Sequence, residues 1–340
     1  MSKEPKTKAL KTISIGGATY DLFLQPDAST VHSMSGENAF TLPLGSKIRI
    51  RNVIEVCGGG ASNTSVGLAR LGCDADYCGV VGDDQWGEKL LTNFRAEGVG
   101  TDSVTIVEGE VSSFSIIMTA ENGERVILYD PGTNDHLHDV TFDRDAAANA
   151  DWVYLNHIQR ETCVIEDDLI LLLAAEGSPA ITWNPGGCQI EIGCFAENNR
   201  KILSHTDLLL LNKEEALGFT KTEDINDAIK LLMEIGVANL CITDGGNGTV
   251  GCDGRNIYKC PCMENVSVID TTGAGDAFGC GATWALLARE SLPEAMRAGT
   301  INASSVVASI GAQPGLLTNI EMRDQLQKVH LDVSVQKFEM

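Results

Sequence analysis

The segment DTTGAGD at residues 270–276, followed by the apolar run AFGCGATWALLA, is the most informative stretch of the chain. Two residues typical of strands, Val268 and Ile269, come before it, so its glycines are expected to lie between a strand and a helix. Glycines in that place allow the backbone N–H groups of residues 273–275 to converge on one point. Because a helix N-terminus also attracts negative charge, the segment predicts a binding site for an anion.

Asp276 ends this segment and is the candidate catalytic residue. A carboxylate repels phosphate, so Asp276 would be a poor phosphate ligand. It can instead act as a general base that accepts the proton of an incoming hydroxyl group. An acidic residue in a first helical turn can also simply favour the helix dipole. The flanking glycines favour the catalytic interpretation.

Outside this segment, apolar runs of strand length alternate with longer amphipathic stretches. The expected strands are Thr12–Gly16, Asp76–Val81, Trp152–Leu155, Ala180–Trp183, Leu208–Leu211 and Leu240–Thr243. The expected helices include Ala61–Leu71, Gln85–Glu97, Cys163–Glu176, Asp224–Ile235 and Gly275–Arg289, with another starting near Pro293. Because the strand candidates are continuously apolar, they are expected to be buried on both faces of a parallel sheet. The alternation predicts an α/β class and a doubly wound sheet flanked by helices.

Two excursions, at about 22–55 and 104–130, interrupt this alternation. The first contains Lys47–Val56, which is expected to be extended, and the second contains two strand-like runs around an Asn122-Gly123 turn, a strong hairpin signal. We expect the excursions to form a small β-sheet that serves as a lid over the carboxyl ends of the main strands. A pair of surface loops is the alternative. With no repeat or linker, residues 1–340 are expected to form one domain.

The charge balance excludes several classes of partner. The chain has 47 acidic and 25 basic residues and a formal net charge of −22. Nucleic acids and anionic membranes select clustered Lys and Arg, so neither is an expected partner. No apolar run reaches the roughly 20 residues of a membrane span. The 11 cysteines include no CxxC pair, which is typical of reduced thiols rather than a zinc site. A cytoplasmic location is expected.

A second glycine-rich stretch, CGGGASNTSVGLARLG at 57–72, leads from an extended segment into a helix. Gly58 and Gly59 could belong to a nucleotide-binding fingerprint, but Asn63 replaces its third glycine. The stretch could instead be a hinge whose backbone and Asn63 amide bind ligand hydroxyl groups. A purely structural turn is the third alternative.

Polar residues also follow two of the expected buried strands. Asn212 and Glu215 are three residues apart, so they share one side of a helical turn, where oxygen ligands could orient Mg²⁺-bound water and a triphosphate. The run TDGGNG at 243–248 forms a glycine turn suited to phosphates. Each pattern alone also fits an ordinary helix start or turn.

Several catalytic classes lack their motifs. The sequence has no GxxxxGK[ST] loop, no HExxH, no GxSxG and no protein-kinase HRD and DFG set. A nicotinamide-dependent oxidoreductase would need a complete glycine fingerprint. A non-catalytic sugar-binding protein would be expected to lack Asp276.

Taken together, the motifs resemble those of the PfkB/ribokinase family of small-molecule kinases. DTTGAGD matches the second signature of that family, GGGASNTSVGLARLG at 58–72 matches the first, and Asn212 and Glu215 match its NxxE motif. The opening IGGATYD, which ends at Asp21, is similar to its first strand and sugar-binding aspartate. The four motifs stand in the order of the family and cover nearly the whole chain.

The resemblance implies a ribokinase-like α/β core with a closing β-lid and an ATP-dependent kinase that phosphorylates a primary hydroxyl. Asp276 would be the catalytic base, and the backbone of Gly273, Ala274 and Gly275 would form the anion hole. The acceptor would be bound by Asp21, Gly58, Gly59 and Asn63. The nucleotide would be bound by Asn212, Glu215, Thr243, Gly245, Gly248 and Asn302, the last opening a segment that flanks the base and ends at Gly315.

The resemblance also implies metal ions. Glu215 would bind Mg²⁺ through water. A K⁺ ion would lie beside the anion hole, held by Asp270, Thr272, Val306 and Gly311, although Gly315 stands where many relatives have serine.

The acceptor itself stays open between two classes. A sugar needs hydroxyl partners such as Asp21, and this is the preferred acceptor because aromatic residues make up only 5% of the chain. A nucleoside, the alternative, also needs an apolar slot for its base. The aromatic residues in or near the expected lid could form the wall of that slot or belong to the core: Tyr20, Phe23, Phe40 and Phe114. An exposed lid edge favours a homodimer.

Overall fold

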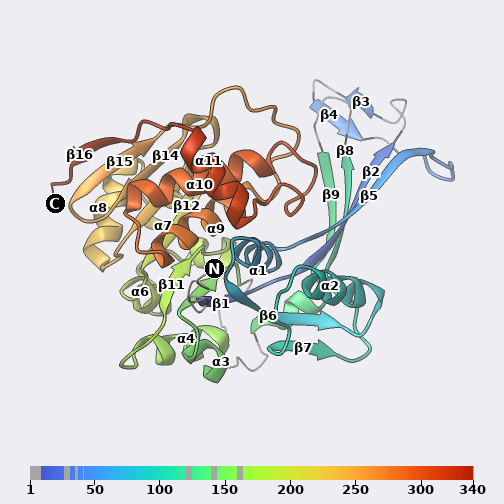
Figure 1. Ribbon diagram of the computed structural model, residues 1–340. Coiled ribbons are helices and arrows are strands. Elements are labelled where there is room, and N and C mark those ends of the chain that lie inside the picture. Colours follow the sequence, from blue (N-terminus) through green and yellow to red (C-terminus); the bar gives the residue numbers. More distant parts are fainter. Residues whose placement is uncertain are drawn as a thin grey trace, which may run out of the picture.

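The computed structural model describes residues 9–26, 31–34, 37–40, 42–119, 125–138, 144–158 and 164–339. Its main body is a ten-stranded sheet in the order β16-β15-β14-β13-β12-β11-β10-β1-β6-β7 (Figure 1). The strands are β1 (Lys11–Ile15), β6 (Asp74–Gly82), β7 (Val104–Val107), β10 (Trp152–Leu155), β11 (Ala180–Trp183), β12 (Leu208–Asn212), β13 (Leu240–Thr243), β14 (Thr249–Cys252), β15 (Asn256–Cys260) and β16 (Ser334–Lys337). Pairing is parallel from β7 to β13 and antiparallel from β13 to β16.

Helices cover both faces of this sheet. They are α1 (Gly60–Arg70), α2 (Gln85–Ala96), α3 (Arg144–Ala148), α4 (Val164–Leu173), α5 (Gly187–Ile192), α6 (Glu197–Leu203), α7 (Lys213–Thr220), α8 (Ile225–Ile235), α9 (Ala274–Leu287), α10 (Leu292–Val306) and α11 (Asn319–Lys328), with 3₁₀ turns at Gly132–His138 and Gly245–Asn247. Alternate residues of a strand belong to different cores: Val153 and Leu155 pack toward α4 and α8, whereas Tyr154 packs toward α9 and α10. The predicted doubly wound α/β architecture is confirmed.

The two excursions form a second sheet, as the sequence predicts. Its order is β5-β2-β8-β9, and its strands are β2 (Thr19–Pro26), β5 (Ile50–Gly58), β8 (Phe114–Thr119) and β9 (Arg125–Asp130). A hairpin of β3 (Val31–Met34) and β4 (Glu37–Phe40) lies at its outer end (Figure 1). We call the four-stranded sheet the lid. The Asn122-Gly123 turn lies outside the described residues.

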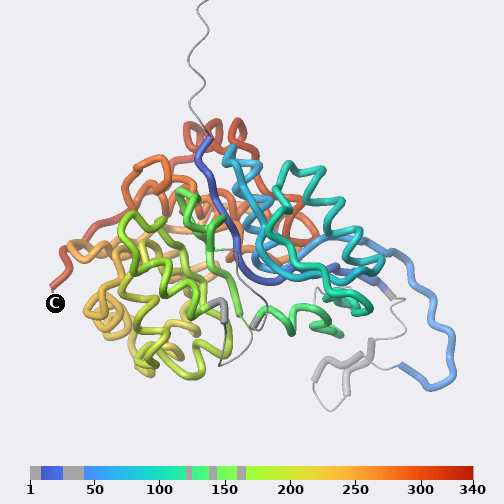
Figure 2. Tube along the Cα trace, turned by 90° about the horizontal axis from the view of Figure 1, so that it is seen from below, coloured from blue at the N-terminus to red at the C-terminus, as the bar shows by residue number. Residues whose placement is uncertain are grey.

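The lid stands at one side of the body, and the C-terminal strand β16 lies at the opposite side (Figures 1 and 2). Figure 2 also shows the segment 42–50 running out along the periphery before β5 returns to the core. Because β5 continues directly into α1, the lid is joined to the body next to the glycines at 58–60. In the part of the chain that the structure describes, no helix combines the length and apolar character of a membrane span.

Some local expectations are confirmed and one is wrong. The Asp224 side chain caps α8 by accepting from Asn226 N at 2.8 Å, and Pro293 lies in the first turn of α10. Val268 and Ile269, in contrast, do not form a strand and are 61% and 57% exposed. The segment has left the sheet after β15, and the Ile269 amide pairs with the Val307 carbonyl at 2.7 Å instead.

Candidate active site

The site forms where α9 begins, at the carboxyl ends of the parallel strands. Gly273 is the N-cap of α9 and has a φ of +75°, in the left-handed region that disfavours other residues. A Cβ on residue 273 would lie only 2.8 Å from the Cα of Ala312 and would therefore collide with it. Glycine is thus needed both for the turn and for its close packing on the loop after α10. Since first-turn amides lack partners within a helix, the amides that follow can face an anion.

Asp276 lies in the first turn of α9 and is held by α1. The Asn63 side chain donates from Nδ2 to Asp276 Oδ2 at 2.8 Å, across 213 residues of sequence. Burial raises the pKa of the Asp276 carboxyl, and the nearby Glu215 carboxylate raises it further, whereas Asn63 and His157 oppose this rise. A carboxyl group with a raised pKa is a stronger proton acceptor than an ordinary aspartate.

The other predicted acceptor-binding residues lie where the lid meets the core. Asp21, on β2, is 7% exposed, and a Cβ at Gly58 would collide with its carboxylate. Gly59 has a φ of +90°, and a Cβ there would lie 2.7 Å from Ala18 Cα. Both glycines therefore permit the close approach of β5 to β2. Burial raises the pKa of Asp21 to about 6, helped by the neighbouring Asp270 carboxylate and opposed by a hydrogen bond with Ser115.

A cavity of about 440 Å³ opens beside the α9 N-terminus. Among its walls are three predicted nucleotide-binding residues, Thr243, Gly245 and Gly248, together with Ala274 and Gly275 of the predicted anion hole. The structure thus brings the glycine turn after β13 and the glycine turn before α9 together around one cavity.

Asn302 does not line this cavity, so its predicted contact with the nucleotide is corrected. Its side chain is fully buried, donating to Ala277 O at 2.8 Å and accepting from Leu317 N at 3.1 Å. It therefore joins α10 to α9. The face of α10 that does line the cavity carries Thr300, Ala303 and Ser304.

Asn212 and Glu215 form a reciprocal capping box at the start of α7. Asn212 Oδ1 accepts from Glu215 N, and Glu215 Oε2 accepts from Asn212 N, both at 2.8 Å. Both side chains lie at the carboxyl end of β12, with enough exposure to offer further oxygen ligands. The Glu215 carboxylate is near enough to Asp276 to raise the pKa of that carboxyl.

The residues implied for K⁺ are already engaged by the protein. Asp270 Oδ1 accepts from Thr272 N at 3.0 Å and from Thr272 Oγ1 at 2.7 Å, and Asp270 Oδ2 accepts from Gly311 N at 3.0 Å. The Arg125 guanidinium, on lid strand β9, forms an ion pair with Asp270 and donates to Thr272 Oγ1 at 2.9 Å. Arg125 thus supplies the positive charge at this carboxylate, and in this lid position the residues do not fit a K⁺ ion.

Val306, another residue implied for K⁺, lies at the end of α10 with its side chain buried in the core. Its carbonyl accepts from Ser309 N at 2.9 Å. The described residues contain no cluster of three or more His, Cys, Asp or Glu side chains able to hold a metal.

Sequence reasoning missed two residues of the site, Arg125 and Gln313. Arg125 reaches Asp270 from the lid, and Gln313 hydrogen-bonds to Asn63 from the loop after α10. Gln313 lies within the segment that ends at Gly315, but that pattern assigns no role to its side chain. Both residues act across more than 140 residues of sequence, so their contacts cannot be identified locally.

With this geometry established, comparison with known proteins identifies the family. The family model described as "pfkB family carbohydrate kinase" matches residues 35–319. The Ribokinase of Haemophilus influenzae is 30% identical over 297 residues, covering 85% of this chain and 92% of that protein.

Solved structures share the same fold. The chain aligns with Arabidopsis thaliana Ribokinase complexed with ribose and ATP at a TM-score of 0.75 and 21% identity, covering 94% of this chain and 99% of that one. It aligns with Methanocaldococcus jannaschii Nucleoside Kinase at a TM-score of 0.74 and 24% identity, covering 94% and 98%. The chain therefore belongs to the pfkB family of carbohydrate kinases and is a phosphotransferase that acts on a hydroxyl group.

Proposed function

We propose that this chain transfers the γ-phosphate of ATP to a primary hydroxyl group of a sugar, with Asp276 as the general base. The observation that carries this proposal is the position of Asp276. It directly follows Ala274 and Gly275, which line the cavity, and its carboxylate is bound by Asn63 of α1. An acceptor bound at the lid would present its hydroxyl group to Asp276, and a nucleotide in the cavity would present its terminal phosphate to the amides.

The reaction then needs one proton transfer and one displacement. Asp276 takes the hydroxyl proton as the acceptor oxygen bonds to the γ-phosphorus, and the bond from that phosphorus to the β,γ-bridging oxygen breaks to release ADP. Negative charge on the transferred group is stabilised by the amides of Gly273, Ala274 and Gly275 and by the α9 dipole. The Ala274 amide also forms a long bond to Thr271 O at 3.3 Å, which shapes the turn.

Magnesium would enter with the nucleotide. Glu215, through water, and Asn212 are the residues that would hold it, and the bound ion would neutralise phosphate charge. That neutralisation is needed because the described walls of the nucleotide cavity contain neither Lys nor Arg. The K⁺ requirement implied by the resemblance stays a prediction, and Arg125 on Asp270 weighs against it in this lid position.

A sugar is preferred as the acceptor because the lid aromatics are largely engaged elsewhere. Tyr20 and Phe114 each stack on Trp86, with ring centroids 5.1 and 6.1 Å away, on the face of β2 opposite Asp21. Phe40 lies at the end of β4, and its side chain is outside the described part of the chain.

A nucleoside remains the alternative because of Phe23. It is two residues after Asp21 on the same face of β2, and it lines a cavity of about 520 Å³ between lid and core, together with Arg125 and Asp270. An aromatic ring beside that cavity could contact a base.

We also propose a homodimer through the lid. The edge strand β9 exposes four consecutive large side chains, Val126, Ile127, Leu128 and Tyr129, each 37–51% exposed. Exposed apolar edge strands tend to pair with another chain. An Ile127→Glu variant should shift the mass in light scattering to that of a monomer; an unchanged mass of one chain for the unmodified protein would contradict the proposal.

The decisive test of the base is Asp276→Asn. This variant should lower kcat by about 10²–10⁴-fold, the usual contribution of general base catalysis, while calorimetry finds ADP binding unchanged. The matched control is Asp83→Asn, because Asp83 only accepts a hydrogen bond from the Gly109 amide at the surface. A variant at Asp276 with more than a tenth of the wild-type rate would refute the assignment.

A further inference from the structure

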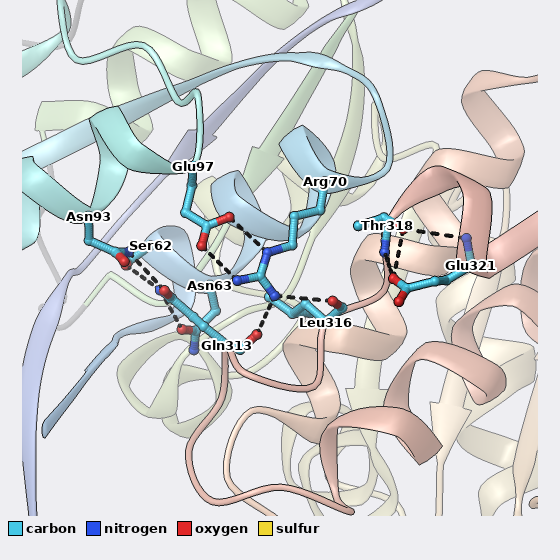
Figure 3. A network of polar contacts seen from close by, with 9 residues as sticks. All are labelled: Ser62, Asn63, Arg70, Asn93, Glu97, Gln313, Leu316, Thr318 and Glu321. Atoms are coloured by element: carbon cyan, nitrogen blue, oxygen red, sulfur yellow. Dashed lines mark hydrogen bonds and ion pairs between the residues drawn. The ribbon is translucent and has the colours of Figure 1, made fainter. Parts of the chain in front are cut away.

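Gln313 is a buried residue whose side chain contacts both α1 and α2. It lies on the loop after α10, is 5% exposed, and donates from Nε2 to Ser62 Oγ at 3.0 Å and to Asn63 Oδ1 at 3.3 Å (Figure 3). Its Oε1 accepts from the Asn93 side chain of α2 at 2.9 Å. A glutamine side chain is thus enclosed between α1 and α2, with both ends of its amide engaged.

The amide groups along this path all point toward Asp276. Gln313 accepts from Asn93 through Oε1 and turns its NH₂ group toward Asn63. Asn63 must then accept with its oxygen and keep its own NH₂ group for Asp276, to which it donates at 2.8 Å. Three amides therefore form a chain in which each donates toward the Asp276 carboxylate.

Ion-paired groups hold the loop of Gln313 in place. Arg70 Nη1 donates to the carbonyls of Gln313 at 2.7 Å and Leu316 at 3.1 Å. The same guanidinium forms a two-point ion pair with Glu97, at 2.8 and 2.7 Å (Figure 3). Both side chains are mostly buried, at 21% and 24% exposed, so the pair is weakly screened by solvent.

The same loop also supports the anion hole. Gly311 donates to Asp270, and Ala312 packs against Gly273 at the start of α9. Residues 311–313 therefore contact the phosphate side of the site and, through Gln313, the acceptor side.

We propose that Gln313 is a positioning residue that fixes the orientation of the Asn63 amide, and thereby of the Asp276 carboxylate, and links them to the loop that supports the anion hole. The inference rests on the proposed role of Asp276. Without the Gln313 donor, the Asn63 oxygen loses its bond from Gln313, and of these two bonds only the one to the Asp276 carboxylate still orients the amide.

The main test uses Gln313→Glu, a substitution of nearly the same shape. A glutamate at this position still accepts from Asn93 and Ser62, but it cannot donate to Asn63, so the Asn63 NH₂ group should turn away from Asp276. We expect kcat/KM for the acceptor to fall about tenfold or more, as for a lost hydrogen bond to a charged group. The acid limb of the pH profile should move to higher pH, and ADP affinity should not change.

Two controls separate positioning from a loss of stability. Asn199→Ala removes another buried side chain with two hydrogen bonds, to Gln189 O and Gly193 O, on α6, which packs into a different core from α9. It should lower the melting temperature without moving the pH profile. In an Asn63→Ala background, the effect of Gln313→Glu on kcat/KM should largely vanish, because Gln313 would act through Asn63.

The result that overturns the inference is a Gln313→Glu protein with the wild-type pH profile and kcat/KM, or one whose effect is undiminished in the Asn63→Ala background. Failure of the proposed function is a different outcome. In that case the Asp276→Asn protein itself would keep its activity, whatever the Gln313 variants do.

Discussion

Because Asp21 is buried, its ionised form should lower the stability of the free enzyme. Asp21→Asn should remove this cost. Burial and the Asp270 carboxylate raise the pKa of Asp21 from 3.8 to about 6. One pKa unit corresponds to about 1.36 kcal/mol, so ionised Asp21 costs about 3 kcal/mol at a pH above both values.

The sign and pH range follow from linkage. The folded protein binds this proton more tightly than the unfolded chain, so stability falls as the pH rises from about 4 to about 6 and is then constant. An asparagine side chain at this position has no such titration. We therefore expect Asp21→Asn to gain about 1 kcal/mol at pH 4.5 and about 3 kcal/mol at pH 7.5, measured by urea unfolding.

The same variant should lose function. An ionised Asp21 accepts strong hydrogen bonds from an acceptor hydroxyl, and such bonds contribute about 1.5–3 kcal/mol, so KM for the acceptor should rise roughly 10–100-fold. Asp253→Asn is the contrasting control. Burial raises the pKa of Asp253, but hydrogen bonds from Asn256, Arg255 and Tyr258 outweigh it and lower the pKa, so this variant should lose stability at pH 7.5. A gain for Asp21→Asn that does not grow with pH, or an unchanged KM, would refute the reasoning.

Three further predictions concern the phosphate side of the site. Gly273→Ala should lower kcat at least tenfold and reduce the melting temperature, because a Cβ at φ +75° is strained and collides with Ala312; a wild-type rate would contradict the role of this turn. In Arg125→Ala, Asp270 loses its guanidinium partner, so the rate should rise more steeply with added K⁺ than in the unmodified protein. Identical K⁺ titrations of the two proteins would show that Arg125 does not substitute for the ion. Chelation of Mg²⁺ should abolish turnover, and Glu215→Gln should raise the Mg²⁺ concentration needed for half-maximal rate; an unchanged requirement would remove Glu215 from ion binding.

Much of the fold could be predicted because it is encoded locally. Strands such as Trp152–Leu155 and Leu240–Thr243 are short apolar runs with polar boundaries, and the structure has them with the predicted bounds. The same rule failed at Val268 and Ile269, which are equally apolar. A strand also needs a neighbour with free backbone groups, and the sequence does not show where the chain leaves the sheet.

The site likewise contains residues that a local pattern predicts and residues that it does not. The glycine motifs predicted which residues gather at the α9 N-terminus, because positive φ values and close approach leave a visible requirement for glycine at Gly59 and Gly273. Asn302 was misassigned because a polar residue in a motif can bind backbone as readily as ligand. Arg125 and Gln313 depend on lid and loop packing across long stretches of chain, which no local pattern reports.

The central claim is phosphoryl transfer from ATP to a sugar hydroxyl. It is tested most directly by incubating the protein with MgATP and a panel of sugars and nucleosides, following ADP release and locating the new phosphate by ³¹P NMR. The account predicts ADP release that depends on a sugar, with phosphate on its primary hydroxyl, and none with Asp276→Asn. Release supported only by nucleosides would establish the alternative acceptor, and no acceptor-dependent release from either class would contradict the account.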